Sequence, residues 1–473
     1  MLPRVCLIFV AILSFTTSPL FAQSLTLDRV LQSSLDHFPQ IQAALSDIEA
    51  ARGELQAAKG PFDLTLNNTL SARIRGFFSG DFHDTEIVKR FQDFNARVAL
   101  GYRQSQGDFP IYEDILFTNE DGEVSLSVAL SLLRNRDIDS DRFGILRSEV
   151  AFEQSRLSAI LTQVSVQRRA FLAYLNWLSA GKELQVYQEL LEIALERDEA
   201  LKKRAEQGDV AEITLVENQQ FIVQRRAIFL QAKRDFENAA NILSLFVRDE
   251  AGKPRAALVS ELPENFPDLD KRLFDDVTTE VDRVLDVSPE VSQLENEMRL
   301  AKGQIALGEN SIRPKLDLEL YNAEDFGFGE NGSPTREGFE SVVTLNLSFN
   351  LQQNLGRGQV QKGRATLKKL EFQKQQLAEQ LTASLLNIVN NINTASDIVA
   401  LSEQEIDVTA RMERAERTKF DNGQSDFFLV NIREVNQADA RVKNVIAQKN
   451  YLESLGNYMV ATLDFESLGL NPI

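Results

Sequence analysis

The sequence predicts a mixed α and β fold, with about four strands per chain in a membrane-spanning β-barrel that is continuous with a long α-helical coiled-coil tube. It also predicts an internal two-fold repeat. Three observations support this. The N-terminus has the order of an export signal, two stretches of about 64 residues have unbroken helical periodicity, and four short stretches alternate strictly between apolar and polar residues.

The first 22 residues have the order of a secretory signal peptide. Arg4 supplies the positive charge, residues 5–15 are apolar but too few for a stable anchor, and Ala22 ends a candidate cleavage site. An uncleaved membrane anchor is the alternative. Cys6 is the only cysteine and lies inside this segment, so the mature chain would have none with which to form a disulfide. We therefore expect an exported protein.

The charge balance and the hydropathy narrow the class further. The chain has 51 Lys and Arg against 70 Asp and Glu, and loss of Arg4 with the signal leaves 50 against 70, a net charge of −20. Such an acidic chain is not expected to bind nucleic acid. No run of about 20 apolar residues follows residue 22, so the mature chain would have to cross a membrane with β-strands.

Short motifs recur in the same order in the two halves of the chain. The tetrapeptide FPQI at 38–41 recurs as SPEV at 288–291. We interpret residues 23–248 as a first structural repeat, 249–272 as a linker around the waist of the tube, and 273–473 as a second repeat. Together they would make one channel domain in a trimer.

Each repeat contains the same series of helices. In the first, a leading helix at about 26–60 is followed after the strands by a very long helix at about 142–206 and a return helix at about 210–248. The second has a long helix at about 357–420 and a return helix at about 426–463. A helix of about 64 residues is about 96 Å long, which no compact core can bury. The leading and return helices together match the long helix, so we expect them stacked end to end along it.

The long helices carry an apolar seam with steps of three and four residues. Its positions are Phe143, Leu146, Val150, Leu157, Leu161, Val164, Phe171, Leu175 and Leu178 in the first repeat, and Leu377, Leu381, Leu385, Ile388, Ile392 and Val399 in the second. Such a seam predicts a coiled coil. Tyr174 and Trp177 are expected to belong to it. An ordinary elongated coiled coil explains the helices equally well. The strands are therefore needed to distinguish it from a membrane channel.

Four stretches of up to about ten residues alternate between apolar and polar side chains. Their apolar positions are Leu64, Leu66, Leu70, Ala72 and Ile74; Val124, Leu126, Val128, Leu130 and Leu132; Leu316, Leu318 and Leu320; and Val343, Leu345, Leu347, Phe349 and Leu351. This pattern is typical of barrel strands that face lipid on one side and a lumen on the other. A soluble, half-buried sheet is the alternative. Because the chain is expected to be exported and each stretch lies beside a long helix, we favour membrane-spanning strands.

A fifth alternating stretch at 96–102 complicates the count. An odd number of crossings would leave one long helix on the wrong side of the membrane. We therefore interpret residues 76–122 as an outside loop, in which the fifth stretch pairs locally with 111–118, and residues 325–338 as the loop between the other two strands. Four strands cannot close a barrel alone, so the chain should oligomerise: two chains would give a filled bore and three an aqueous lumen.

The order of all these elements resembles the TolC-type outer-membrane efflux protein family over the whole mature chain. So do the PQI and PEV openings at 39–41 and 289–291 and the glycine-marked helix ends. The resemblance implies a homotrimer with a twelve-stranded outer-membrane β-barrel and a twelve-helix periplasmic tube. It also implies that the tips bind a periplasmic adaptor linked to an inner-membrane transporter. The tip residues it marks are Gly208, Leu215, Val216, Gly423, Leu429 and Val430.

The residues that would close the periplasmic aperture depart from the family pattern. Some members carry acidic residues six and nine positions after the second tip glycine, where this chain has Leu429 and Ile432. The acidic candidates near the tips are Glu212, Glu217, Asp421 and Asp426. We favour a helix N-cap for Asp426, because it begins a return helix. A ring of Glu217 side chains would favour cations in the lumen.

No pattern predicts an active site, a cofactor site or a metal site. The segment 327–332, GFGENG, fits a dinucleotide fingerprint but is followed by Ser-Pro-Thr rather than a helix, so we assign it to a surface loop. His37 and His83 are the only histidines, and neither has a ligand spacing around it. We expect a protein that is not an enzyme.

Three functions remain to be compared. The first is a passive export duct, the outer-membrane channel subunit of a tripartite efflux pump or a type I secretion system. The second is a coiled-coil structural protein without a pore that bridges the layers of the envelope. The third is an adhesin or enzyme displayed on the loops 76–122 and 325–340. The alternating strands favour the duct, because a bridging rod needs no lipid-facing side chains.

Overall fold

A computed structural model describes residues 24–249, 252–268, 277–329, 335–464 and 466–470. The predicted signal peptide at 1–22 lies outside these ranges. The helices are α1 (Leu27–His37), α2 (Pro39–Ala58), α3 (Ser140–Glu206), α4 (Glu212–Leu243), α5 (Val277–Val287), α6 (Pro289–Ile312), α7 (Asn354–Asp421) and α8 (Phe427–Ala461). The strands are β1 (Leu64–Ser71), β2 (Asp81–Arg90), β3 (Ala96–Gln106), β4 (Glu123–Ser131), β5 (Lys315–Asp325) and β6 (Phe339–Ser348).

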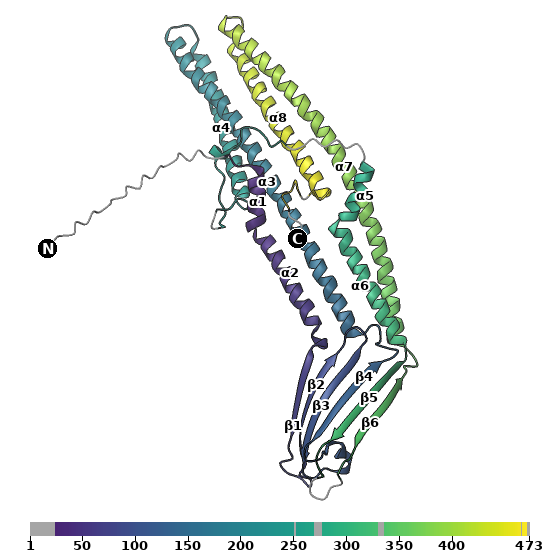
Figure 1. Cartoon of the computed structure of the whole chain (residues 1–473). Coiled ribbons are helices and arrows are strands. Elements are labelled where there is room, and N and C mark those ends of the chain that lie inside the picture. The colour runs from purple at the N-terminus through teal and green to yellow at the C-terminus, as the bar shows by residue number, and fades with distance from the viewer. Residues whose placement is uncertain (1–23, 250–251, 269–276, 330–334, 465, 471–473) are drawn as a thin grey trace, which may run out of the picture.

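The two long helices set the length of the molecule. Helix α3 has 67 residues and α7 has 68, so each is about 100 Å long. The shorter helices lie end to end beside them, as predicted: α2 and α4 along α3, and α6 and α8 along α7 (Figure 1). The sheet lies at one end of this body and the two helical tips lie at the other.

The leading helix of each half is broken, which the sequence prediction of one helix at 26–60 missed. Phe38 is extended between α1 and α2, with φ −73° and ψ 123°, and Pro39 begins α2. Ser288 and Pro289 make the same break between α5 and α6. Proline suits the first position of a helix, because its missing N–H needs no partner there, but it disfavours helix in the residue before it.

The main apolar core lies at the waist, where α1, α3, α4 and α8 converge. Trp177 and Tyr174 are almost fully buried there, and the Trp177 ring lies 6.3 Å from that of Phe236. The Tyr174 hydroxyl donates to the carbonyl of Leu25 over 3.1 Å. Both aromatic residues therefore belong to the seam, as predicted. The described part of the 249–272 linker lies at this level, where the Leu25 N–H donates to the Glu261 carbonyl over 2.9 Å.

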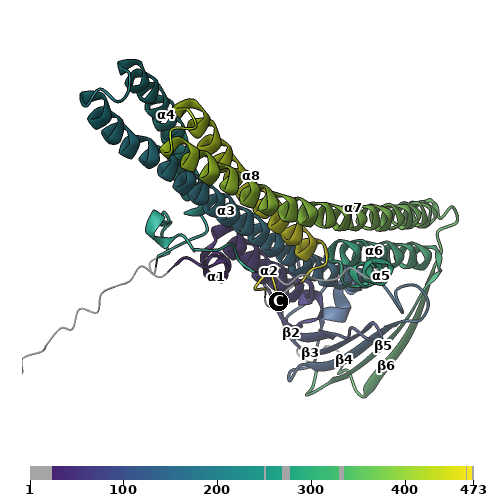
Figure 2. The same cartoon turned by 90° about the horizontal axis from the view of Figure 1, so that it is seen from above.

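The helices form a curved wall one helix thick. Contacts join α4 to α3, α3 to α8 and α8 to α7 in the half near the tips. In the half near the sheet they join α2 to α3, α3 to α6 and α6 to α7. The wall therefore has one edge at α4 and α2 and the other at α7, and Figure 2 shows this arrangement from above. No described helix is long and apolar enough to cross a membrane.

The sheet differs from the predicted four strands. All six strands pair antiparallel in chain order, from β1 to β6. The stretch at 96–102 is a full strand, β3, and its partner β2 escaped prediction, so 76–122 is not simply a loop. Residues Ile111–Leu116 form a 3-10 helix instead of a pairing strand. The prediction assigned the stretch at 96–102 to a loop because its partner strand, β2, was not recognised.

The elements of the two halves follow one another in similar order. Two short helices lead to strands, and strands lead to a long helix and a return helix in each case. Duplication of one ancestral unit stays a prediction.

Candidate functional site

The register of the sheet gathers the apolar side chains on one face. Leu66 lies opposite Ile87, Ile87 opposite Leu100, and Leu100 opposite Leu126. Across β5 and β6, the same face continues with Leu316 beside Leu347, Leu318 beside Leu345, and Leu320 beside Val343. The leucines of β5 are half-buried and the others are exposed in the single chain; Leu347, for example, is 72% exposed. A face of this kind is suited to lipid hydrocarbon.

The opposite face is polar and carries paired charges. Arg97 lies 3.2 Å from the Glu86 carboxylate, and Arg103 lies 3.0 Å from that of Asp84. The Ser131 hydroxyl donates to Asp317 over 3.1 Å. Residues from all six strands contribute, among them Thr65, Asn67, Ser125, Ser127, Glu319, Thr344 and Asn346. Such a face is suited to a water-filled lumen.

The segment 107–119 folds back over the polar face at the end of the sheet remote from the helices. The backbone N–H of Ser105 donates to the Thr118 hydroxyl over 3.0 Å, and Arg103 donates to the Ile115 carbonyl over 2.9 Å. The Asn119 N–H donates to Asp325 over 3.1 Å, and the Asn119 side chain is fully buried. The predicted outside loop therefore reaches into the space in front of the polar face.

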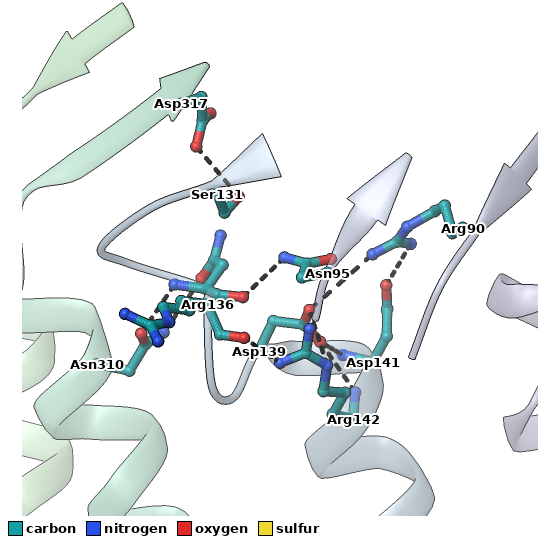
Figure 3. A network of polar contacts seen from close by, with 10 residues as sticks. Arg90, Asn95, Ser131, Arg136, Asp139, Asp141, Arg142, Asn310 and Asp317 are labelled. Carbon is teal, nitrogen blue, oxygen red and sulfur yellow. Dashed lines mark hydrogen bonds and ion pairs between the residues drawn. The ribbon is translucent and has the colours of Figure 1, made fainter. Parts of the chain in front are cut away.

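The junction between sheet and helices is a network of polar contacts (Figure 3). Asp139 caps α3 by accepting from the backbone N–H groups of Asp141 and Arg142, both over 2.9 Å. Arg90, at the end of β2, donates to the Asp141 carboxylate over 2.6 Å. Asn95, in the turn between β2 and β3, donates to the backbone carbonyl of Asn135 over 2.7 Å. The sheet is thus fixed to the first turn of the long helix.

Both tip glycines end a long helix, as the sequence predicts. Gly208 and Gly423 have φ of +82° and +72° and follow the ends of α3 and α7. After α3, the N–H of Gly208 donates to Ala205 and that of Asp209 to Arg204; after α7, Gly423 and Gln424 donate in the same pattern to Phe420 and Lys419. This is the Schellman motif, in which glycine is preferred because of its positive φ.

The predicted docking residues differ in accessibility. Val216 and Leu429 are exposed, Leu215 is half-buried, and Val430 is buried against the neighbouring helices. The two exposed residues have further exposed apolar neighbours on the first turns of α4 and α8: Ile213, Phe428 and Ile432. Their use by an adaptor stays a prediction, and Val430 would contribute through the packing of the tip rather than by contact.

The predicted aperture residues lie at the same end of the molecule. Glu212, Glu217 and Asp421 are exposed. Asp426 is the N-cap of α8, where its carboxylate accepts from the Leu429 N–H over 2.8 Å, so the favoured interpretation is confirmed. The N-cap of α4 is Ala211, which has no side chain to do the same. The role of the acidic residues in an aperture stays a prediction.

A buried ionic cluster lies a few turns below the tips, and no pattern in the sequence predicts it. Glu434 on α8 accepts from Arg225 on α4 over 3.0 Å and from Arg417 on α7 over 3.1 Å, and it also pairs with Arg197 on α3. Asn431 accepts from Arg225 over 3.0 Å. The cluster joins the helical hairpin α3–α4 to the hairpin α7–α8. Only the fold brings these residues together, because the pairs are up to 237 positions apart.

The electrostatics of this cluster favour the charged forms. Burial opposes the negative charge of Glu434, but the positive charges of Arg197 and Arg225 outweigh it and hold the pKa of this carboxyl below its usual range. Burial lowers the pKa of the Arg225 guanidinium, and the negative charge of Glu434 opposes this shift. Removing one member of such a buried pair leaves the other uncompensated, which typically costs about 3–5 kcal/mol.

Two features of the described residues concern a metal or cofactor site. Within them, no group of three or more His, Cys, Asp or Glu side chains is arranged to hold a metal ion. Gly327 has φ of +87° and ends the ladder of β4 and β5 rather than preceding a helix. The next described element after this loop is β6, so the described part of the glycine-rich segment has no helix N-terminus for a phosphate.

Comparison with solved structures identifies the fold. The outer-membrane channel OprN superposes with a TM-score of 0.65 at 13% identity, over 92% of this chain and 89% of that chain. The outer membrane protein VceC of Vibrio cholerae gives 0.62 at 13%, over 92% and 95%. The CmeC outer membrane channel of Campylobacter jejuni gives 0.62 at 12%, over 99% and 95%.

No protein-family profile matches the sequence, and no curated protein matches it. The likeness at this level of identity is therefore one of fold. It covers nearly the whole chain, helices and sheet together, in agreement with the resemblance drawn from the order of the elements.

Proposed function

Since this chain has the fold of TolC-type outer-membrane efflux channels, we propose that it is a subunit of a homotrimeric channel in the outer membrane of a Gram-negative-type bacterium. Its sheet would belong to a barrel in the membrane, and its helices would form a tube in the periplasm. The assembly would be a passive conduit for export. The observation that carries this proposal is that the single chain is an open wall with two unsatisfied edges.

The two edges run the full length of the molecule. One consists of β1, α2 and α4, and the other consists of β6 and α7. Every residue of β1 and of β6 is exposed in the single chain. Unpaired backbone groups at a sheet edge cannot face lipid, so β1 of one copy has to pair with β6 of the next.

The helical edges carry matching apolar stripes. On α4, the exposed residues Val223 and Leu230 lie seven positions apart. On α7, exposed apolar residues recur at helical steps: Ile398, Leu401, Val408 and Met412. A coiled-coil seam has this spacing, so α4 of one copy is expected to pack against α7 of the next. Three copies of a wall four helices wide would give the twelve-helix tube that the resemblance implies.

The tips would make the contacts with the rest of an export system. We propose that the two Schellman turns and the exposed residues Val216 and Leu429 bind a periplasmic adaptor, which connects the channel to an inner-membrane transporter. The transporter would be an efflux pump or a type I secretion transporter. The channel needs no chemistry of its own, and we propose that it is not an enzyme.

The competing function is a structural rod that bridges the envelope layers without a pore. The two-faced sheet argues against it, because a rod gains nothing from an apolar face on the outside of six strands. Cell fractionation separates the two. The channel should be recovered in the outer membrane, resist extraction by salt and alkali, and migrate differently on gels before and after heating. Recovery of the full-length mature protein in the soluble periplasmic fraction, without aggregation, would contradict the proposal.

A further inference from the structure

The hairpin of β2 and β3 is as long as the strands around it. Strand β2 has 10 residues and β3 has 11, whereas β1 has 8 and β4 has 9. A strand that crosses a bilayer at a tilt needs about 9–11 residues. The hairpin pairs with β1 over 8 residue positions and with β4 over 8, so it is an integral part of the sheet.

The hairpin continues the apolar face along β3 and at one position of β2, whose other residues on this side are polar or charged. Ile87 on β2 and Val98, Leu100 and Tyr102 on β3 point to the same side as the apolar residues of β1 and β4. Leu100 is 52% exposed and lies opposite Leu126, which is 42% exposed. The other side carries Arg97, paired with Glu86 as described above. A hairpin outside the membrane would have water on both sides, where an apolar face gives no advantage.

The turn of the hairpin reaches the helical end of the sheet. Figure 3 shows Asn95 and Arg90 bound to the segment that starts α3. The Phe91 N–H donates to the Ala96 carbonyl over 2.8 Å and closes the turn. The rings of Phe91 and Phe94 stack there at 5.4 Å and are partly exposed, which suits an aromatic girdle at the membrane surface. The hairpin therefore spans the whole height of the sheet.

We propose that β2 and β3 are membrane-spanning strands, so that each chain contributes six strands instead of four. The apolar face of the hairpin would contact the hydrocarbon of the outer membrane. The proposal rests on the proposed trimer: three six-stranded sheets would close a barrel of eighteen strands, not the twelve that the resemblance implies. Two chains would suffice for twelve strands, but their tube would then contain eight helices instead of twelve.

A barrel of eighteen strands has a different bore. Barrels of about 16–18 strands enclose an open aqueous channel, wider than one of twelve. The segment 107–119, which lies against the polar face, would project into that bore from each chain. The membrane part would then admit bulky solutes except where these three segments narrow it, close to the outer mouth.

Site-directed spin labelling tests the position of the hairpin. The mature chain is predicted to lack cysteine, so Leu100→Cys, Ile87→Cys, Leu126→Cys, Ser127→Cys and Phe77→Cys each give one nitroxide site. Leu126 is the matched lipid-face reference, because it lies opposite Leu100 on a strand that crosses in either arrangement. Ser127 reports the polar face, and the fully exposed Phe77 reports water beyond β1. The measured quantity is collision of each label with oxygen and with a water-soluble nickel complex.

The proposal predicts that labels at Leu100 and Ile87 behave like the label at Leu126, accessible to oxygen and protected from nickel. If the label at Leu126 is protected from nickel but those at Leu100 and Ile87 behave like the label at Phe77, the hairpin lies outside the membrane. The proposal is then wrong, but the proposed channel function is not contradicted. Protection of Leu100 from both reagents would mean that a protein covers it, and would also overturn the proposal. Access of nickel to Leu126 would contradict the barrel itself. Electron microscopy of the purified assembly along its axis should then show eighteen strands; twelve would contradict the count.

Discussion

Glu434 and Arg225 form an ion pair of 3.0 Å between α8 and α4, with both side chains almost fully buried. The pair, together with Arg197 and Arg417, joins the two helical hairpins near the tips. Charges are costly to bury, so the arrangement is stable only while every member is present. This cluster is therefore a buried polar connection between the two hairpins.

We expect Glu434→Ala to destabilise the tip half of the tube. Loss of the carboxylate leaves Arg225 buried without its partner, and the cost is about 3–5 kcal/mol. The control is Glu405→Ala, which removes an exposed ion pair of 2.8 Å with Lys443 and should therefore lower the melting temperature much less. Thermal melting followed by the helical circular dichroism signal measures both. Equal melting temperatures for the two variants would show that the cluster does not hold the hairpins together.

The same carboxyl should make the tube sensitive to acid. Its pKa is lowered in the folded protein, so its contribution to stability is fully present above the unfolded value of about 4.3 and is lost as the pH falls through the lowered pKa. The melting temperature of the natural protein should exceed that of Glu434→Gln at neutral pH, and the difference should shrink below about pH 4.3. A difference that stays constant down to pH 2 would contradict the assignment.

The two faces of β6 should respond differently to a charge. Leu347 lies beside Leu316 on the apolar face, and Asn346 lies beside Asp317 on the polar face. Leu347→Arg should impair insertion, since a charge near the middle of the bilayer costs about 2–4 kcal/mol, and Asn346→Arg should be tolerated. The measurement is the amount of heat-modifiable protein in the outer membrane. Equal amounts of the two variants would show that the faces are assigned wrongly.

The tip glycines should matter for docking more than for assembly. A Cβ at Gly208 or Gly423 would meet no atom of a more distant residue within 4 Å, so valine there costs mainly the strain of a positive φ, about 1–3 kcal/mol. We expect the double variant Gly208→Val and Gly423→Val to insert and oligomerise normally but to lose export and adaptor cross-linking. Outer-membrane abundance, oligomer size and efflux are measured on the same cells. Normal efflux would mean that these turns do not bind the adaptor.

Local signals predict the helical half of the fold, apart from the breaks in the leading helices. Gly208 and Gly423 could be identified because a helix end with positive φ depends on neighbouring residues alone. The seam through Trp177 follows from helical periodicity within α3. The alternation around Leu126 and Leu347 likewise follows from the period of a strand, and the structure places both on one face.

The remaining features depend on contacts between distant residues. Strand β2 has a single large aliphatic residue on the apolar face, Ile87, among polar and charged neighbours, so it could be recognised only beside β1 and β3. Without it, β3 had no partner and was assigned to a loop. Arg225 and Glu434 are 209 positions apart, and the sequence around each one predicts a solvated charge on a helix. Only the packing of four helices shows that they are buried.

The central claim is that the edges of this wall close between three copies. Native mass spectrometry of the assembly extracted from outer membranes in detergent tests it most directly. The account predicts a single species of three mature chains, because three walls complete both the tube and the barrel. A species of two chains would contradict the trimer and the eighteen-stranded barrel together, and a stable single chain would contradict the channel.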